Sequence, residues 1–450
     1  NSSGETDFAR ALESKALGRF LKDGTVGGYE EVSSEEFVKL RLQNREIDSA
    51  GDAAVKILRH ERIPFRSYPY EWTPGMLHAA AVLTLDLAES LLEDGMGLKD
   101  ATPYNVLFKG AQPVFVDWLS FEVRDDRDPI WLAQSQFLRT FCLPLMANKY
   151  FGIELGSIFR ESRDGIEPDK IYKLCSLRQR FSSPFFSVVT LPTLLKGKAQ
   201  NKPSIYQKQL LDSSEKARFV LSQQFKSLRK LLAKLVPAKN TKSVWSDYVG
   251  DNQHFTDEYF QQKADFVKRA LEISTPERVL DVGCNTGFFS KIAADSGARV
   301  VSVDYDSAVV EKVYQIARRD KLNILALAVD FSRPSPAMGW RNLECPSFIE
   351  RASKKTDGIL MLAVIHHLLV SERIPLSEII ELAAEIAGQT AIIEFVPPDD
   401  PMFKQIARGR DHLFSELNSE VFRDICSRHF KIVSYEKLAD SNREIYHLEK

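Results

Sequence analysis

The chain has 450 residues, more than one ordinary domain, so two domains and a connector are expected. Its apolar content of 44% and aromatic content of 10% are enough for packed cores and argue against general disorder. A formal net charge of −2 argues against a surface devoted to nucleic acid, so we expect no sequence-specific nucleic-acid partner.

The five cysteines are scattered along the chain, and no two have the C-x-x-C spacing of a zinc site or a redox motif. We therefore expect no metal centre and a reducing compartment. No apolar run approaches the ~18 residues that would span a bilayer, and the first residues contain no signal-type apolar region. These features predict a cytoplasmic protein and leave its oligomeric state open.

Residues 1–195 mix helical and strand patterns and are expected to form an α+β domain. Residues 74–94 carry apolar side chains at helical spacing and should form a core helix. Residues 98–118 then predict a hairpin that has Asp100 and Asn105 at its start and Asp117 at the end of its second strand. This stretch resembles the catalytic hairpin of kinase-like phosphotransferases of the aminoglycoside-phosphotransferase type, in which an Asp base and a metal-binding Asn precede an Mg²⁺-binding Asp.

The hairpin also departs from that pattern, and three interpretations stay open. Lys99 stands where a His or Gly usually precedes the base, and the 99 residues upstream of Asp100 are few for a complete nucleotide-binding lobe. The hairpin can belong to a degenerate kinase-like scaffold or to a working phosphotransferase. Alternatively, Asp100 and Asn105 are turn residues that bond the backbone.

Residues 196–242 are strongly basic, with twelve Lys or Arg against two acidic residues. Their apolar side chains follow a long helical pattern, which predicts a basic helical connector between the two domains. Such a surface can be a solvated helix face, or a landing surface for an acidic substrate or an anionic lipid.

Residues 278–290 form a strand, a glycine turn and the start of a helix, in the order Arg-Val-Leu-Asp-Val-Gly-Cys-Asn-Thr-Gly-Phe-Phe-Ser. Glycines in such a turn let the backbone approach a ligand, and the N-terminus of the following helix carries partial positive charge. The spacing from Asp281 through Gly283 to Gly287 differs from the G-x-G-x-x-G dinucleotide fingerprint. Asp304 ends the next apolar run, where a carboxylate can accept hydrogen bonds from ribose hydroxyls.

This constellation resembles motif I and the following acidic position of class I S-adenosylmethionine-dependent methyltransferases, and the resemblance covers residues 243–450. Strand patterns continue at 300–304, 324–330, 358–364, 390–396, 430–435 and 444–448, and helical patterns separate the earlier ones. This alternation predicts an α/β fold with a doubly wound sheet. The resemblance makes it a seven-stranded Rossmann-like sheet with an antiparallel last strand.

The resemblance also implies which residues hold the cofactor, S-adenosyl-L-methionine. Asp304 would bind the ribose, Asp330 the adenine amino group, and Phe331 would pack on the adenine ring. Tyr248 would cover the methionine end and Lys263 would meet its carboxylate, although either residue could simply pack or be solvated. The full predicted cofactor set is Asp281, Gly283, Cys284, Asn285, Gly287, Phe288, Asp304, Tyr305, Asp330, Phe331, Leu362, Tyr248 and Lys263.

Three residues are candidates for the chemistry at the ends of later strands. His366 and His367 follow the strand pattern at 358–364, and a histidine near neutral pKa can take a proton from an acceptor hydroxyl. Two adjacent histidines point in different directions, so at most one is expected to face the cofactor, and both could instead cap or pack a helix. Glu394 is a second candidate base, or a group that positions a polar substrate.

We therefore predict a methyltransferase that acts on a small-molecule or sugar-type acceptor, with an N-terminal domain that assists substrate binding. The alternative is a phosphotransferase, or a bifunctional enzyme, that works through Asp100, Asn105 and Asp117.

Overall fold

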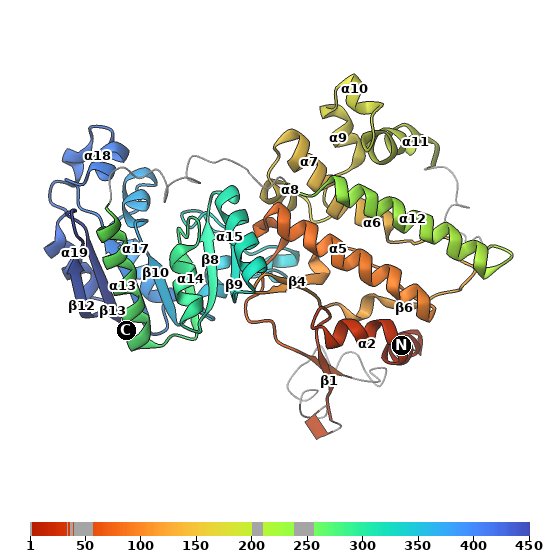
Figure 1. Ribbon diagram of the computed structural model, residues 1–450, viewed down its shortest axis with the longest axis horizontal. Coiled ribbons are helices and arrows are strands. Elements are labelled where there is room, and N and C mark those ends of the chain that lie inside the picture. Colours follow the sequence, from red (N-terminus) through yellow and green to blue (C-terminus); the bar gives the residue numbers. More distant parts are fainter. Residues whose placement is uncertain (1, 34, 37–38, 40–56, 200–209, 238–255) are drawn as a thin grey trace.

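The computed structural model describes residues 2–33, 35–36, 39, 57–199, 210–237 and 256–450. Figure 1 shows a mostly helical N-terminal half beside a C-terminal half built on one large sheet. In the described part of the N-terminal half the strands pair only two by two, β1 with β2, β3 with β6 and β4 with β5. Those strands are β1 (Tyr29–Glu31), β2 (Leu58–His60), β3 (Met96–Leu98), β4 (Val106–Lys109), β5 (Gln112–Phe115) and β6 (Phe121–Val123).

The core helix expected at 74–94 is present as α5 (Pro74–Leu91) with a short 3₁₀ turn after it. Thr73 begins the helix because its side chain accepts a hydrogen bond from Met76 N, and Pro74 suits the first turn. By length and mean hydropathy this segment could cross a membrane, but 61% of it is buried inside the fold. The α5 helix is therefore the centre of the N-terminal core.

Shorter helices make up most of the rest of the N-terminal half (Figure 1). They are α1 (Ser2–Glu13), α2 (Lys15–Lys22), α6 (Gln134–Phe137), α7 (Leu143–Phe151), α8 (Leu155–Glu161), α9 (Pro168–Leu174), α10 (Leu177–Arg180) and α11 (Leu191–Ala199). Two π-helical turns, Leu138–Cys142 and Phe186–Thr190, lead into α7 and α11.

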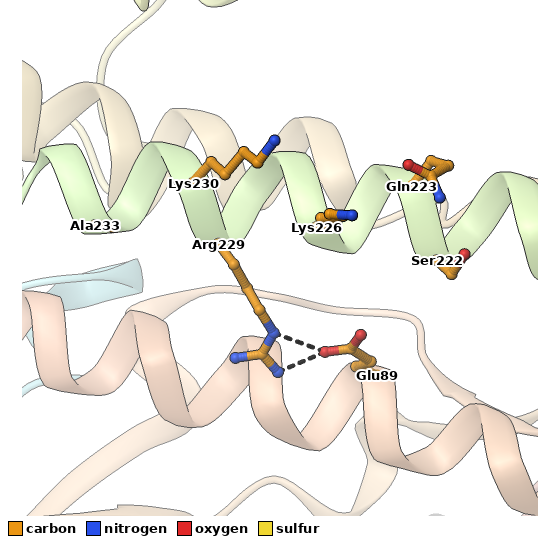
Figure 2. A pocket seen from close by; sticks show the side chains of 7 residues that line it. All are labelled: Glu89, Ser222, Gln223, Lys226, Arg229, Lys230 and Ala233. Atoms are coloured by element: carbon orange, nitrogen blue, oxygen red, sulfur yellow. Dashed lines mark hydrogen bonds and ion pairs between the residues drawn. The ribbon is translucent and has the colours of Figure 1, made fainter.

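Within the predicted basic connector, residues 196–199 end α11, and α12 (Ser214–Lys234) packs along α5. Its apolar side, including Leu221, Phe225 and Leu228, is buried, as its helical spacing predicts. Arg229 reaches across to α5 and pairs with Glu89, lining a shallow depression, while Lys226 and Lys230 do not point toward Glu89 (Figure 2). This helix is thus part of the N-terminal core, although the sequence predicts a separate connector.

The C-terminal sheet has seven strands in the order β12-β13-β11-β10-β7-β8-β9. All neighbours are parallel except β13, which pairs antiparallel with both β11 and β12. The predicted seven-stranded sheet and its final hairpin are confirmed. The strands are β7 (Arg278–Val282), β8 (Arg299–Asp304), β9 (Ile324–Ala328), β10 (Gly358–Met361), β11 (Thr390–Phe395), β12 (Lys431–Lys437) and β13 (Glu444–Glu449).

Helices cover both faces of this sheet (Figure 1). They are α13 (Asp257–Ser274), α14 (Phe288–Asp295), α15 (Ser307–Asp320), α16 (Phe348–Ser353), α17 (Leu376–Ile386), α18 (Pro401–Ala407) and α19 (Ser419–Ser427). Because the connections between parallel strands are helical, the carboxyl ends of β7 to β11 gather at one edge, where ligands bind in such folds.

The two halves meet through buried polar contacts. The guanidinium of Arg351 on α16 forms an ion pair with Glu71, and both side chains are almost fully buried. Glu311 on α15 accepts a hydrogen bond from Gly75 N at 2.8 Å, at the start of α5. These contacts fix the N-terminal half against one end of the C-terminal sheet.

Candidate active site

The glycine turn after β7 has the backbone geometry that its sequence predicts. Gly283 and Gly287 have φ values of 70° and 81°, in the left-handed region that favours glycine. A Cβ at Gly283 would lie 3.1 Å from Val364, and one at Gly287 would lie 3.0 Å from Val313. Asn285 has a φ of 47° and its buried side-chain Oδ1 has no hydrogen-bond partner. The turn is therefore tightly packed and has a buried acceptor available to a ligand.

Asp304 lies directly against this turn. Its Oδ2 accepts a hydrogen bond from Asn285 N at 3.0 Å and its Oδ1 accepts one from Asp306 N at 3.0 Å. Burial raises the pKa of Asp304, and the backbone N–H groups of Asp306 and Asn285 partly offset this effect. Each carboxylate oxygen has further lone pairs, so the geometry suits the ribose contact that the sequence predicts.

Asp281 is a buried acid behind the turn. Its Oδ2 accepts a hydrogen bond from Ser290 Oγ at 2.5 Å, and Ser290 also lies on the first turn of α14. Burial raises the pKa of Asp281 from 3.8 to about 6, although the Ser290 hydrogen bond opposes the change. A cationic cofactor nearby would favour the ionised form of Asp281 and would therefore lower its pKa.

We expect Asp281→Asn to change the pH dependence of stability in the ligand-free protein. Because its folded pKa is raised, wild-type Asp281 contributes stability that is lost as pH rises from about 4 through its folded pKa of about 6. The shift of about two pKa units corresponds to on the order of 3 kcal/mol of unfolding free energy. Asp281→Asn cannot titrate, so the stability of this variant should not fall by that amount as the pH rises. Thermal unfolding across this pH range measures the difference, with exposed Asp295→Asn as the control. Parallel curves for wild type and Asp281→Asn would contradict the expectation.

The remaining predicted adenine contacts lie after β9. Asp330 accepts hydrogen bonds from the backbone N and Oγ of Ser332, and Arg333 Nε lies 3.2 Å from its Oδ2. Burial acts to raise the pKa of Asp330, but these donors hold it below its ordinary value. Phe331 is half-buried beside it, while Tyr305, after β8, is exposed. An ionised, oriented Asp330 is a suitable acceptor for an amino group.

Glu394, a predicted base, lies at the centre of a buried ionic network. Its Oε2 lies 2.5 Å from Lys263 Nζ, and its Oε1 accepts hydrogen bonds from Tyr259 OH at 2.6 Å and from Arg443 Nη1 at 3.3 Å. Arg443 also pairs with Asp400 at 2.9 Å. Burial alone would raise the pKa of Glu394, but Lys263 and Arg443 hold it below its ordinary value.

This environment does not suit the roles expected from the sequence for two of these residues. A carboxylate between two cations accepts a proton poorly, because protonation would leave those cations without their counter-charge. The ammonium of Lys263 forms an ion pair with Glu394. Its charge is therefore already neutralised within the protein, and it does not need the carboxylate of the methionine moiety as a partner. The sequence indicates neither Arg443 nor Tyr259 as a member of this network, since no local motif marks them.

His366 and His367 lie just beyond β10. The two rings are adjacent, with centroids 4.3 Å apart, and His366 is buried with no hydrogen-bond partner for its Nδ1. Burial lowers the pKa of His366 well below its ordinary value, and burial together with Arg443 lowers that of His367 to about 4. Both imidazoles are therefore neutral at pH 7 and can accept a hydrogen bond.

The other predicted cofactor residues have mixed surroundings. Cys284 and Leu362 are buried at the ends of β7 and β10, and Phe288 is exposed on the first turn of α14. Tyr248 lies outside the described residues.

The kinase-like hairpin forms, and its polar residues bond one another. Asp117 accepts hydrogen bonds from Leu119 N at 3.0 Å and from Ser120 Oγ at 2.5 Å. Asn105 Nδ2 donates to the same Ser120 Oγ at 3.0 Å. Across the described ranges, no group of three His, Cys, Asp or Glu side chains is close enough together to hold a metal ion. Asp117 therefore caps the short turn that follows it, and the Ser120 hydroxyl joins Asn105 to Asp117.

Comparison with known proteins agrees with the fold of the C-terminal half. A family model described as a methyltransferase domain matches residues 221–443. The chain is 31% identical over 400 residues to nodulation protein NoeA of Rhizobium meliloti (strain 1021), with 88% of this chain and 82% of that protein covered.

Solved structures with some likeness include N-methyltransferase NodS of Bradyrhizobium japonicum WM9 in complex with S-adenosyl-L-homocysteine, at 14% identity and a TM-score of 0.33 over 45% of this chain and 90% of NodS. Another is magnesium protoporphyrin IX methyltransferase (ChlM) of Synechocystis PCC 6803, at 19% identity and a TM-score of 0.33 over 51% of this chain and 94% of that one. Both TM-scores lie below 0.5.

The seven-stranded sheet, the glycine turn and the acids at its carboxyl edge define an S-adenosylmethionine-dependent methyltransferase. S-adenosylmethionine is the cofactor that this site uses. The chain belongs to the family of nodulation protein NoeA, and its residues 221–443 form a methyltransferase domain.

Proposed function

We propose that this protein transfers a methyl group from S-adenosylmethionine to an oxygen or nitrogen of a small-molecule or sugar-type acceptor. The observation that carries the proposal is the contact between Asp304 and Asn285 N, which joins a carboxylate suited to the ribose to the glycine turn. The bound cofactor supplies an activated methyl group on a sulfonium. The protein then has to hold the acceptor in line with that methyl group and exclude water.

The acceptor pocket is proposed at the carboxyl ends of β10 and β11. His366 and His367 give this region neutral imidazoles, which can take up a proton as an oxygen or nitrogen acceptor loses one. Since His367 has a pKa of about 4, it would hold that proton only briefly before passing it to water. We assign Glu394 a positioning role, in which it fixes Lys263 and Arg443 beside the histidines.

The N-terminal half is proposed to assist substrate binding from its position beside the sheet. The buried pair between Glu71 and Arg351 supports this role, since it fixes the N-terminal half rigidly to the catalytic half. The five cysteines are all free and buried, which supports a cytoplasmic location.

Phosphotransfer through Asp100, Asn105 and Asp117 is the second candidate function. It is favoured by the hydrogen bonds through which the Ser120 hydroxyl joins Asn105 to Asp117.

Calorimetric titration distinguishes the two candidates. We expect S-adenosylhomocysteine to bind with micromolar affinity and ATP with Mg²⁺ to give no binding heat. If ATP bound and S-adenosylhomocysteine did not, the methyltransferase proposal would fail. Binding of both would indicate a bifunctional enzyme, and loss of the ATP heat in Asp117→Asn would then locate the second site.

A further inference from the structure

One part of the N-terminal half exposes an unusual number of large apolar side chains. This apolar lobe, residues 167–196, contains α9, α10 and most of α11 and lies at the edge of the N-terminal half in Figure 1. Leu177 and Phe181 are 72% and 75% exposed, and Leu194 is 62% exposed. The exposed apolar residues of the lobe are Leu174, Leu177, Phe181, Phe186, Leu191, Leu194 and Leu195.

These side chains are exposed although the lobe itself is well anchored. Phe185 and Val189 are buried in the N-terminal core, and the ring of Phe185 packs against that of Tyr150, with centroids 5.0 Å apart. Leu177 begins α10, and Phe181 is the residue that directly follows this helix. The lobe therefore has an inner side that packs and an outer side that presents apolar groups to solvent.

The surroundings of the exposed apolar groups are basic. The lobe has five Lys or Arg residues against two acidic ones, a formal net charge of +3. The neighbouring helix α12 has six basic residues against Glu215, and Lys226 and Lys230 on it are exposed. Lys234 connects α12 to the lobe, because its Nζ donates a hydrogen bond to Ser183 Oγ of the lobe at 2.9 Å. Apolar groups with basic neighbours are the composition of surfaces that lie in the interface of an anionic membrane.

We propose that the apolar lobe and the exposed side of α12 bind the surface of an anionic phospholipid bilayer. Leu177, Phe181 and Leu194 would enter the boundary between headgroups and acyl chains, while lysines such as Lys226 and Lys230 would contact lipid phosphates. A second copy of the chain is a poorer occupant, because pairing the same surface with itself would bring equal positive charges together. The membrane instead offers the opposite charge.

Vesicle cosedimentation of the full-length protein tests this proposal. We expect binding to vesicles of phosphatidylcholine with phosphatidylglycerol, weak binding to phosphatidylcholine alone, and loss of binding as salt is raised. The double variant Leu177→Ser with Phe181→Ser should lower the apparent affinity for the anionic vesicles at least about tenfold. The control is Leu119→Ser with Ile273→Ser, since those residues are 78% and 63% exposed outside the lobe, and it should bind like wild type.

Thermal unfolding and titration with S-adenosylhomocysteine establish that both double variants are folded. Lack of wild-type binding to anionic vesicles, or an equal loss in both variants, would overturn the proposal. Light scattering after size-exclusion chromatography tests whether a second copy of the chain binds this surface instead. A concentration-dependent dimer that the lobe variant abolishes, without vesicle binding by wild type, would show that a second copy covers this surface.

Discussion

Replacing Asp304 with alanine is expected to weaken binding of S-adenosylhomocysteine by at least about a hundredfold while leaving the fold intact. A hydrogen bond to a charged acceptor contributes about 1.5–3 kcal/mol, and the carboxylate can accept one from each ribose hydroxyl. The variant also loses the acceptor for Asn285 N and Asp306 N, which orders the glycine turn. Calorimetric titration measures the affinity, and circular dichroism follows the fold.

A matched control is Asp295→Ala, which removes an exposed carboxylate paired with Lys291 on α14. This variant should bind S-adenosylhomocysteine like wild type. Asp304→Asn keeps the shape and one acceptor oxygen, so its affinity should fall between those of wild type and Asp304→Ala. Wild-type affinity in Asp304→Ala would show that the ribose contact lies elsewhere.

Removing the Glu71 carboxylate is expected to have the largest effect on stability. Its partner Arg351 is buried, also donates to the backbone carbonyl of Arg66, and lies over the rings of Phe65 and Tyr68. Glu71→Ala leaves that guanidinium buried without its counter-charge, which typically costs about 3–5 kcal/mol. Thermal and denaturant unfolding should show this loss, and limited proteolysis should cleave between the two halves sooner.

The control for this second prediction is Arg163→Ala, because Arg163 and Glu344 form an exposed ion pair between the same two halves. Exposed pairs contribute about 0–1 kcal/mol, so this variant should unfold close to wild type. Glu71→Gln with Arg351→Met removes both charges and should recover part of the loss. Equal, small effects of Glu71→Ala and Arg163→Ala would mean that the buried pair does not join the halves.

Much of the methyltransferase half could be predicted from sequence because its signals are local. Each central strand is a short apolar run, and the left-handed turn at Gly283 and Gly287 requires glycine within the motif itself. Asp304 follows at the end of the next strand, so parallel pairing of β7 and β8 brings it to the turn. For these residues, position along the chain and position in the sheet are directly linked.

Other features were decided by the tertiary structure alone. The sequence offers Glu394 as a base or as a group that positions a substrate. In the structure Lys263 and Arg443 pair with it from α13 and from the loop before β13, far away along the chain. The basic residues after 196 predict a connector, but the buried side of α12 packs on α5. The sequence by itself determined the sheet, the turn and the acids at its carboxyl edge, because these follow from local periodicity and backbone geometry. Only the tertiary structure determined which charges neutralise one another and which helices share a core, because those contacts join residues that no local pattern relates.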